Sequence, residues 1–170
     1  DDPQGTAQLN RLLQAAGSGM QLHTDTALDS VHNGGQPDWL YPVNLNRADP
    51  WMKTLSENQY YRHISGCTVS GGTWLVKGHD TTQSSSDGRP APVLLAWEGC
   101  GEGTIFAGGS LWLTDENLAP GKNIWDEPYA NRTLAEAILG IAPPEIPLKD
   151  IHLARKGAQE EVCRIRGYVT

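Results

Sequence analysis

Residues 92–114 read PVLLAWEGCGEGTIFAGGSLWLT, and this stretch decides the expected fold. It contains two short apolar runs, 92–97 and 103–107, with a glycine-rich turn between them. Each run is too short for several helical turns, so the pattern favours two buried, paired strands over a helix. Gly108 and Gly109 follow the second run and allow the backbone to turn sharply where a side chain would collide. We therefore predict an antiparallel pair, 92–97 with 103–107, at the centre of the scaffold.

Composition describes an ordinary globular chain. Its 170 residues suit one compact domain with its own core. The formal net charge of -7 argues against direct nucleic-acid binding and against an anionic-membrane surface, because phosphate binding needs clustered Lys and Arg. No stretch approaches the ~20 apolar residues of a membrane span, and no apolar signal region opens the chain. Asp1 is accordingly expected to begin a mature or trimmed protein.

Two helices and several strands are expected around the central pair. The helices cover residues 6–16 and 127–139, where apolar side chains recur at helical spacing and glycine follows. Further short strands are expected at 20–23, 67–69 and 73–77. Residues 24–50 and 78–90 are rich in turn-forming or polar residues and are predicted to be loops, the second of them exposed. Asp49 is expected to cap a single helical turn that begins at Pro50.

The character of the chain changes after the second helix. Residues 142–149 contain three prolines within a short span and predict a stiff, extended linker. Residues 161–170 alternate apolar and basic side chains, as a half-buried strand does. The expected organisation is a domain at 1–141, the linker at 142–149, and the truncated start of a following β-barrel-type domain at 150–170.

Four features carry a resemblance to a known family: VKGHDTTQSSSDG, PVLLAWE with its glycine-rich turn, TIFAGGSLWLTDENL, and the helix at 131–139. Through them, residues 75–141 resemble the C-terminal part of the class I glutamine amidotransferase-like, flavodoxin-like modules of large secreted bacterial proteins. The resemblance implies an α/β fold, a three-layer sandwich whose mostly parallel sheet includes the one antiparallel hairpin. The tail IHLARKGAQEEVCRIRGYVT is similar to the opening of an oligonucleotide/oligosaccharide-binding barrel of secreted nucleases and phosphoesterases.

Together the two resemblances imply an accessory module of an exported, multidomain hydrolase, secreted or at the cell surface. Active amidotransferases carry their cysteine on a strand-to-helix elbow, followed later in the chain by histidine and glutamate. Here Cys100 lies between two strands, and the one later histidine is His152. The function expected from this departure is a non-catalytic structural or interaction module without a cofactor. Its partners would be the neighbouring domains of the same polypeptide.

The catalytic candidates are Cys100, Ser110, His79 and Asp80. A nucleophile needs a base and an oxyanion hole within reach, and a turn residue is the simpler interpretation of Cys100. Ser110 lacks the Gly-x-Ser-x-Gly pattern of a nucleophile elbow, which favours a corner hydroxyl bonded to nearby backbone. An alternative function is a metal-dependent hydrolase in which His79, Asp80 and Asp115 hold the ion at the sheet edge, where open α/β sheets bind ligands.

A second alternative function is a carbohydrate-binding module that stacks sugars on Trp39, Trp51 and Trp112. Aromatic residues among long loops also seal cores, and the sequence does not identify a small-molecule or carbohydrate ligand. Cys67 and Cys100 could form a disulfide if their strands are neighbours, or remain free thiols.

Overall fold

The computed structural model describes residues 3–41, 44–55, 59–110, 130–140, 145–147 and 164–166. The helices in this part of the chain are α1 (Pro3–Ala15), the 3-10 helix η1 (Pro50–Met52) and α2 (Ala130–Ile138). The strands are β1 (Gln21–Leu22), β2 (Ala27–Leu28), β3 (Trp39–Leu40), β4 (Asn44–Leu45), β5 (His63–Ile64), β6 (Val69–Ser70), β7 (Thr73–Lys77), β8 (Gln83–Ser84), β9 (Val93–Cys100), β10 (Gly103–Gly108), β11 (Glu145–Pro147) and β12 (Arg164–Arg166).

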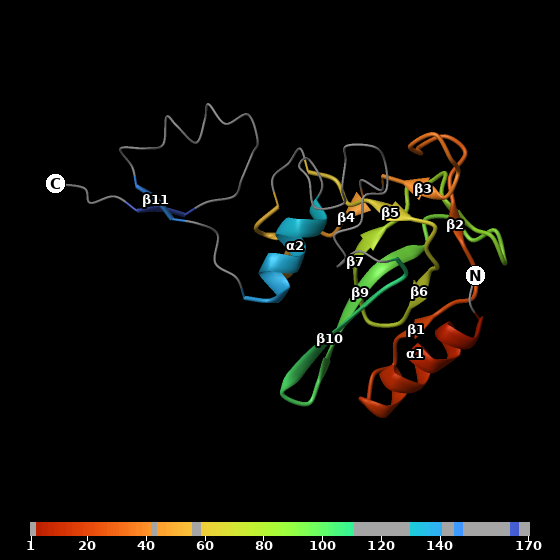
Figure 1. Ribbon diagram of the computed structural model, residues 1–170, viewed down its shortest axis with the longest axis horizontal. Helices are drawn as coiled ribbons and strands as arrows, with labels where there is room; N and C mark the ends of the chain where they lie inside the picture. Colours follow the sequence, from red (N-terminus) through yellow and green to blue (C-terminus); the bar gives the residue numbers. More distant parts are fainter. Residues whose placement is uncertain are drawn as a thin grey trace.

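The main sheet is antiparallel and has β9 at its centre. Its strand order is β1-β6-β9-β7-β4, with β10 also paired to β9. In the β9–β10 hairpin Cys100 pairs with Gly103, and Gly101 in the turn has a φ of 60°. Tight hairpin turns favour such left-handed backbone, which glycine adopts without strain. This hairpin confirms the predicted antiparallel pair of residues 92–97 and 103–107 (Figure 1).

Two hydrophobic clusters form the core, and each receives one of the α-helices. The larger cluster includes Leu75 of β7, Leu94 of β9 and Leu134 of α2. The smaller cluster includes Met20 and Ala107, against which Leu13 of α1 packs. Figure 1 shows α1 and α2 on either side of the β9–β10 hairpin.

The expected fold class, an α/β three-layer sandwich with a mostly parallel, flavodoxin-like sheet, is wrong. Parallel neighbours need a crossover of about a dozen residues or more, usually with a helix in it. Between β1 and β10 the described chain contains no α-helix. Gly71 and Gly72 alone join β6 to β7, which then pair with opposite edges of β9. The resemblance to glutamine amidotransferase-like modules is wrong for the same reason.

Several local expectations are confirmed or corrected. Helices occur at both predicted places, and the Asp49 side chain accepts a hydrogen bond from the Trp51 amide at 3.0 Å, as a helix cap should. The loop predicted for residues 24–50 is wrong in part, since it contains β2, β3 and β4. The exposed loop predicted for 78–90 is also wrong in part, since β8 lies within it.

The two short strands near the C-terminus pair in parallel with each other, β11 with β12. One of them belongs to the expected linker and the other to the expected following domain. The expected division into a domain, a linker and a following domain stays a prediction. None of the helices in the described part of the chain is long and apolar enough to span a membrane.

Candidate metal centre

Two buried aspartates bracket the small ribbon formed by β2 and β8. Asp25 lies shortly before β2 and Asp29 directly after it, and their exposed fractions are 2% and 1%. The two strands pair over two residues each, so the ribbon has few backbone hydrogen bonds of its own. Both carboxylates accept hydrogen bonds from hydroxyl groups of the segment 81–84. These side-chain bonds therefore hold β2 and β8 together from both ends.

The Asp29 carboxylate joins two loops that are distant in the sequence. Its Oδ1 accepts from the backbone N–H groups of Val31 and His32, each at 2.8 Å. Its Oδ2 accepts from the hydroxyl groups of Thr81 and Thr82, also at 2.8 Å each. The first pair fixes the turn after β2, as aspartate commonly does. The second pair attaches that turn to the chain before β8.

Asp29 is ionised at neutral pH. Burial alone would raise its pKa, but the hydrogen bonds from the His32 amide, the Thr81 hydroxyl, the Val31 amide and the Thr82 hydroxyl outweigh burial. Together they lower the pKa of Asp29 to about 2. A fixed negative charge therefore lies beneath the two histidines described next.

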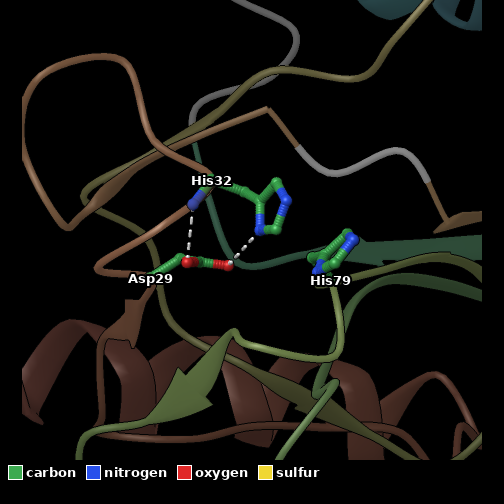
Figure 2. Close-up of side chains that lie close together, drawn as sticks. All are labelled: Asp29, His32 and His79. Atoms are coloured by element: carbon green, nitrogen blue, oxygen red, sulfur yellow. Dashed lines mark hydrogen bonds and ion pairs between the residues drawn. The ribbon is translucent and has the colours of Figure 1, made fainter.

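His32 and His79 come from the two joined loops and stack on each other. Their ring centroids are 3.6 Å apart and their planes are inclined by 30°. The Thr81 hydroxyl lies 2.9 Å from His32 Nδ1 and 3.2 Å from His79 Nδ1. Figure 2 shows the His32 ring directed toward the Asp29 carboxylate, with His79 beside it on the other loop. His32 Nδ1 lies 4.0 Å from Asp29 Oδ2.

This arrangement offers a ligand set for a metal ion. One ligand atom from each of Asp29, His32 and His79 lies within 4.8 Å of the others. Imidazole with carboxylate suits zinc and neighbouring transition metals. The His32 side chain is 45% exposed, so an ion can reach it from solvent.

Of the three metal ligands expected from the sequence, the structure brings one, His79, into the cluster. His79 belongs to the cluster, whereas Asp80 beside it is exposed and does not. Asp115 lies outside the described residues. Sequence reasoning missed Asp29 and His32. The sequence signal for these two residues was Asp-Ser-Val-His followed by Asn-Gly, which is a turn-forming pattern, together with the hydroxyl-rich segment 81–86 further along the chain.

The second buried carboxylate, Asp25, makes a comparable set of bonds. It accepts from the Thr68 amide and the Thr68 hydroxyl, each at 2.8 Å, and from the Ser84 hydroxyl. Burial raises the pKa of Asp25, but these bonds reverse the effect and lower it overall. The neighbouring Cys67 thiol has a raised pKa, because it is buried and because Asp25 is negative. A thiol of that kind is a poor nucleophile.

His63 lies beside this carboxylate in the interior. The residue is fully buried, and neither ring nitrogen has a hydrogen-bond partner of ordinary geometry. The Gly66 backbone lies so close to the His63 ring that a Cβ on Gly66 would collide with it. Burial lowers the pKa of His63 to about 4, although the Gly66 backbone and the Asp25 charge oppose the change.

The lowered pKa of His63 predicts that the protein loses stability in acid. The unfolded chain takes up the proton near pH 6.5, whereas the folded protein takes it up only near pH 4. This contribution to the free energy of unfolding is therefore full above pH 6.5 and falls by about 3 kcal/mol on acidification to pH 4. Urea unfolding across that range should show the loss, and His63→Phe should remove it. An equally steep pH dependence in the variant would contradict the prediction.

The nucleophile candidates expected from the sequence, Cys100 and Ser110, are not members of the histidine cluster. Cys100 ends β9 at the hairpin turn, and Ser110 follows β10 near the buried hydroxyl of Tyr61. No hydrogen bond or ion pair joins either residue to a histidine within the described part of the chain. Both Cys67 and Cys100 are free thiols, which answers the disulfide question left open by the sequence.

Of the tryptophans considered for sugar binding, Trp39 and Trp51 lie in different surroundings. Trp39 is half-buried in β3, and Trp112 lies outside the described residues. Trp51 packs edge-on against Trp97 and Phe106. The ring centroids are 6.3 Å and 5.1 Å apart, and the interplanar angles are 74° and 83°. Edge-to-face packing of this kind is typical of aromatic clusters at the border of a core.

Comparison of the chain with models of protein families, with curated proteins and with solved structures gives no match.

Proposed function

We propose that this domain is a binding module for a divalent transition-metal ion of the zinc class, held by His32 and His79 beside Asp29. The observation that supports the proposal most directly is the convergence of three ligand-type side chains, from two loops, within 4.8 Å. The loops are not neighbours in sequence, since His32 and Thr81 are 49 residues apart. Their junction depends on the buried hydrogen bonds of Asp29.

The donor set favours a borderline ion over calcium or magnesium. Imidazole nitrogen suits zinc, copper and nickel, whereas calcium and magnesium prefer sets composed of oxygen. Two imidazoles beside the carboxylate leave at least one coordination position of a four-coordinate ion for water or for a partner's ligand. Catalytic zinc sites also keep an open position of this kind, so the arrangement fits an interaction module and a metal-dependent hydrolase alike, and turnover measurements separate the two.

Calorimetric titration with zinc tests the proposal. Wild-type protein should bind one ion, and His32→Ala and His79→Ala should each weaken binding by about 100-fold or more. Asp80→Asn is the matched control, since it alters an exposed carboxylate next to His79 and should leave the affinity unchanged. Absence of binding in the wild type, or full binding in both histidine variants, would overturn the proposal.

The same variants separate binding from hydrolysis. A metal-dependent hydrolase would turn over an ester or phosphodiester substrate when zinc-loaded and would lose that activity in His32→Ala and His79→Ala. The binding module proposed here should show zinc uptake without such turnover.

A further inference from the structure

The Thr81 hydroxyl lies at the middle of the candidate metal centre and contacts each of its members. It is 2.8 Å from Asp29 Oδ2, 2.9 Å from His32 Nδ1 and 3.2 Å from His79 Nδ1. A hydroxyl group has one proton to donate and two lone pairs that accept. The direction of that single proton therefore decides what each imidazole can do.

The proton of Thr81 points to Asp29. Four donors converge on that carboxylate, two on each oxygen, and they leave no place for a proton on it. An ionised carboxylate only accepts hydrogen bonds, so Thr81 must be the donor in this contact. Toward His32 the Thr81 oxygen can then only accept. His32 must carry its proton on Nδ1, which leaves the lone pair of the neutral ring on Nε2.

His79 is not constrained in the same way. The Thr81 oxygen lies 3.2 Å from its Nδ1, and the Thr81 backbone N–H points at the same nitrogen from 3.5 Å. The first contact needs a proton on Nδ1, whereas the second needs a lone pair there. The hydrogen-bond network thus assigns the tautomer of His32 and leaves that of His79 free.

Building on the metal-binding function proposed above, we propose that Thr81 is a positioning residue that holds His32 for metal binding through Nε2. Asp29 then acts through the Thr81 hydroxyl and is not itself a ligand. An ion bound by the Nδ1 atoms and Asp29 would instead have to displace the hydroxyl and break a hydrogen bond to the buried carboxylate. Metal-binding histidines commonly donate their other ring N–H to a carboxylate, a backbone carbonyl or water, and the Thr81 hydroxyl takes that place for His32.

Long-range proton–nitrogen correlation NMR on the metal-free protein tests the tautomer directly. The spectrum should show His32 protonated on Nδ1 and unprotonated on Nε2 at neutral pH, and zinc should shift Nε2 most. Thr81→Val should abolish this tautomer preference and weaken zinc binding by about 10-fold to 100-fold, and Thr81→Ser should restore both. Thr82→Val is the matched control, because Thr82 donates to the same Asp29 oxygen at 2.8 Å without a hydrogen bond to either imidazole. It should lower stability without changing the tautomer.

The outcomes separate this inference from the proposed function. Two results would overturn the role of Thr81 and leave the proposed function valid. One is zinc binding by a wild-type protein whose His32 is protonated on Nε2. The other is unchanged or tighter zinc binding in Thr81→Val. Such a result would assign the ion to the central position that the hydroxyl now holds. Failure of the wild type to bind zinc would overturn both the proposed function and the ligand role of Nε2, while the spectrum of the metal-free protein would still decide whether Thr81 orients His32.

Discussion

Replacing Gly109 with alanine is expected to lower the free energy of unfolding by about 4 kcal/mol or more, or to prevent folding. Gly109 donates to the Leu94 carbonyl at 3.1 Å and accepts from the Cys67 amide at 2.9 Å, so the chain after β10 is bonded on two sides. A Cβ at this position would collide with the Cys67 carbonyl. The colliding atoms belong to the backbone, which cannot rotate away as a flexible side chain can.

Urea unfolding followed by circular dichroism measures this effect. Gly99→Ala is the matched control, since Gly99 is exposed in β9 and a Cβ there would meet nothing within 4 Å. Its stability should remain within about 0.5 kcal/mol of the wild type. A Gly109→Ala protein as stable as the control would show that the chain after β10 does not approach Cys67 so closely.

Replacing Asp25 with alanine is expected to cost about 4 kcal/mol of folding free energy. The change removes three hydrogen bonds to a charged acceptor and leaves the Thr68 and Ser84 donors without it in the interior. Unsatisfied buried donors lose their bonds to water without replacement. Asp25→Asn should cost less, because the amide keeps one acceptor oxygen and the two hydroxyl groups can reorient.

The same unfolding assay tests Asp25, with Asp87→Ala as the control. Asp87 is an exposed loop carboxylate whose side chain is 52% accessible, and removing it should change stability by less than about 1 kcal/mol. Equal stability of the Asp25→Ala and Asp87→Ala proteins would mean that the Asp25 bonds do not hold β2, β8 and the Thr68 segment together.

The buried His63, beside Asp25, and the buried Asp29 affect stability in different pH ranges. The His63 contribution is lost between about pH 6.5 and about pH 4. The Asp29 contribution, which comes from a depressed carboxylate pKa, is full above about pH 4 and disappears as the pH falls toward 2. Acid unfolding should therefore begin in the His63 range, before Asp29 is protonated.

Local patterns predicted local structure well. The β9–β10 hairpin, the cap at Asp49 and the approximate positions of both α-helices follow from apolar runs, turn residues and helix signals within about fifteen residues. The error lay in how strands combine, since short apolar runs are compatible with parallel and antiparallel neighbours alike. A family resemblance favoured the parallel arrangement, whereas the short connections produce antiparallel pairs.

The candidate metal centre shows the limit of such patterns. His79 was a candidate from the sequence because it stands next to an acidic residue, but its partners in space are Asp29 and His32. The segment 78–90 appeared to be an exposed polar loop, although Thr82 and Ser84 are 1% and 2% exposed. Their hydroxyl groups are buried because two distant carboxylates accept their protons, a pairing that composition cannot reveal.

The sequence by itself determined where the chain turns and which short runs are apolar, because these properties depend on neighbouring residues. Tertiary structure alone decided which strands lie side by side, which aspartates become buried acceptors and which histidines meet. Those outcomes depend on contacts between residues about 40 to 80 positions apart, and a carboxylate acquires its role only when its donors arrive from elsewhere in the chain.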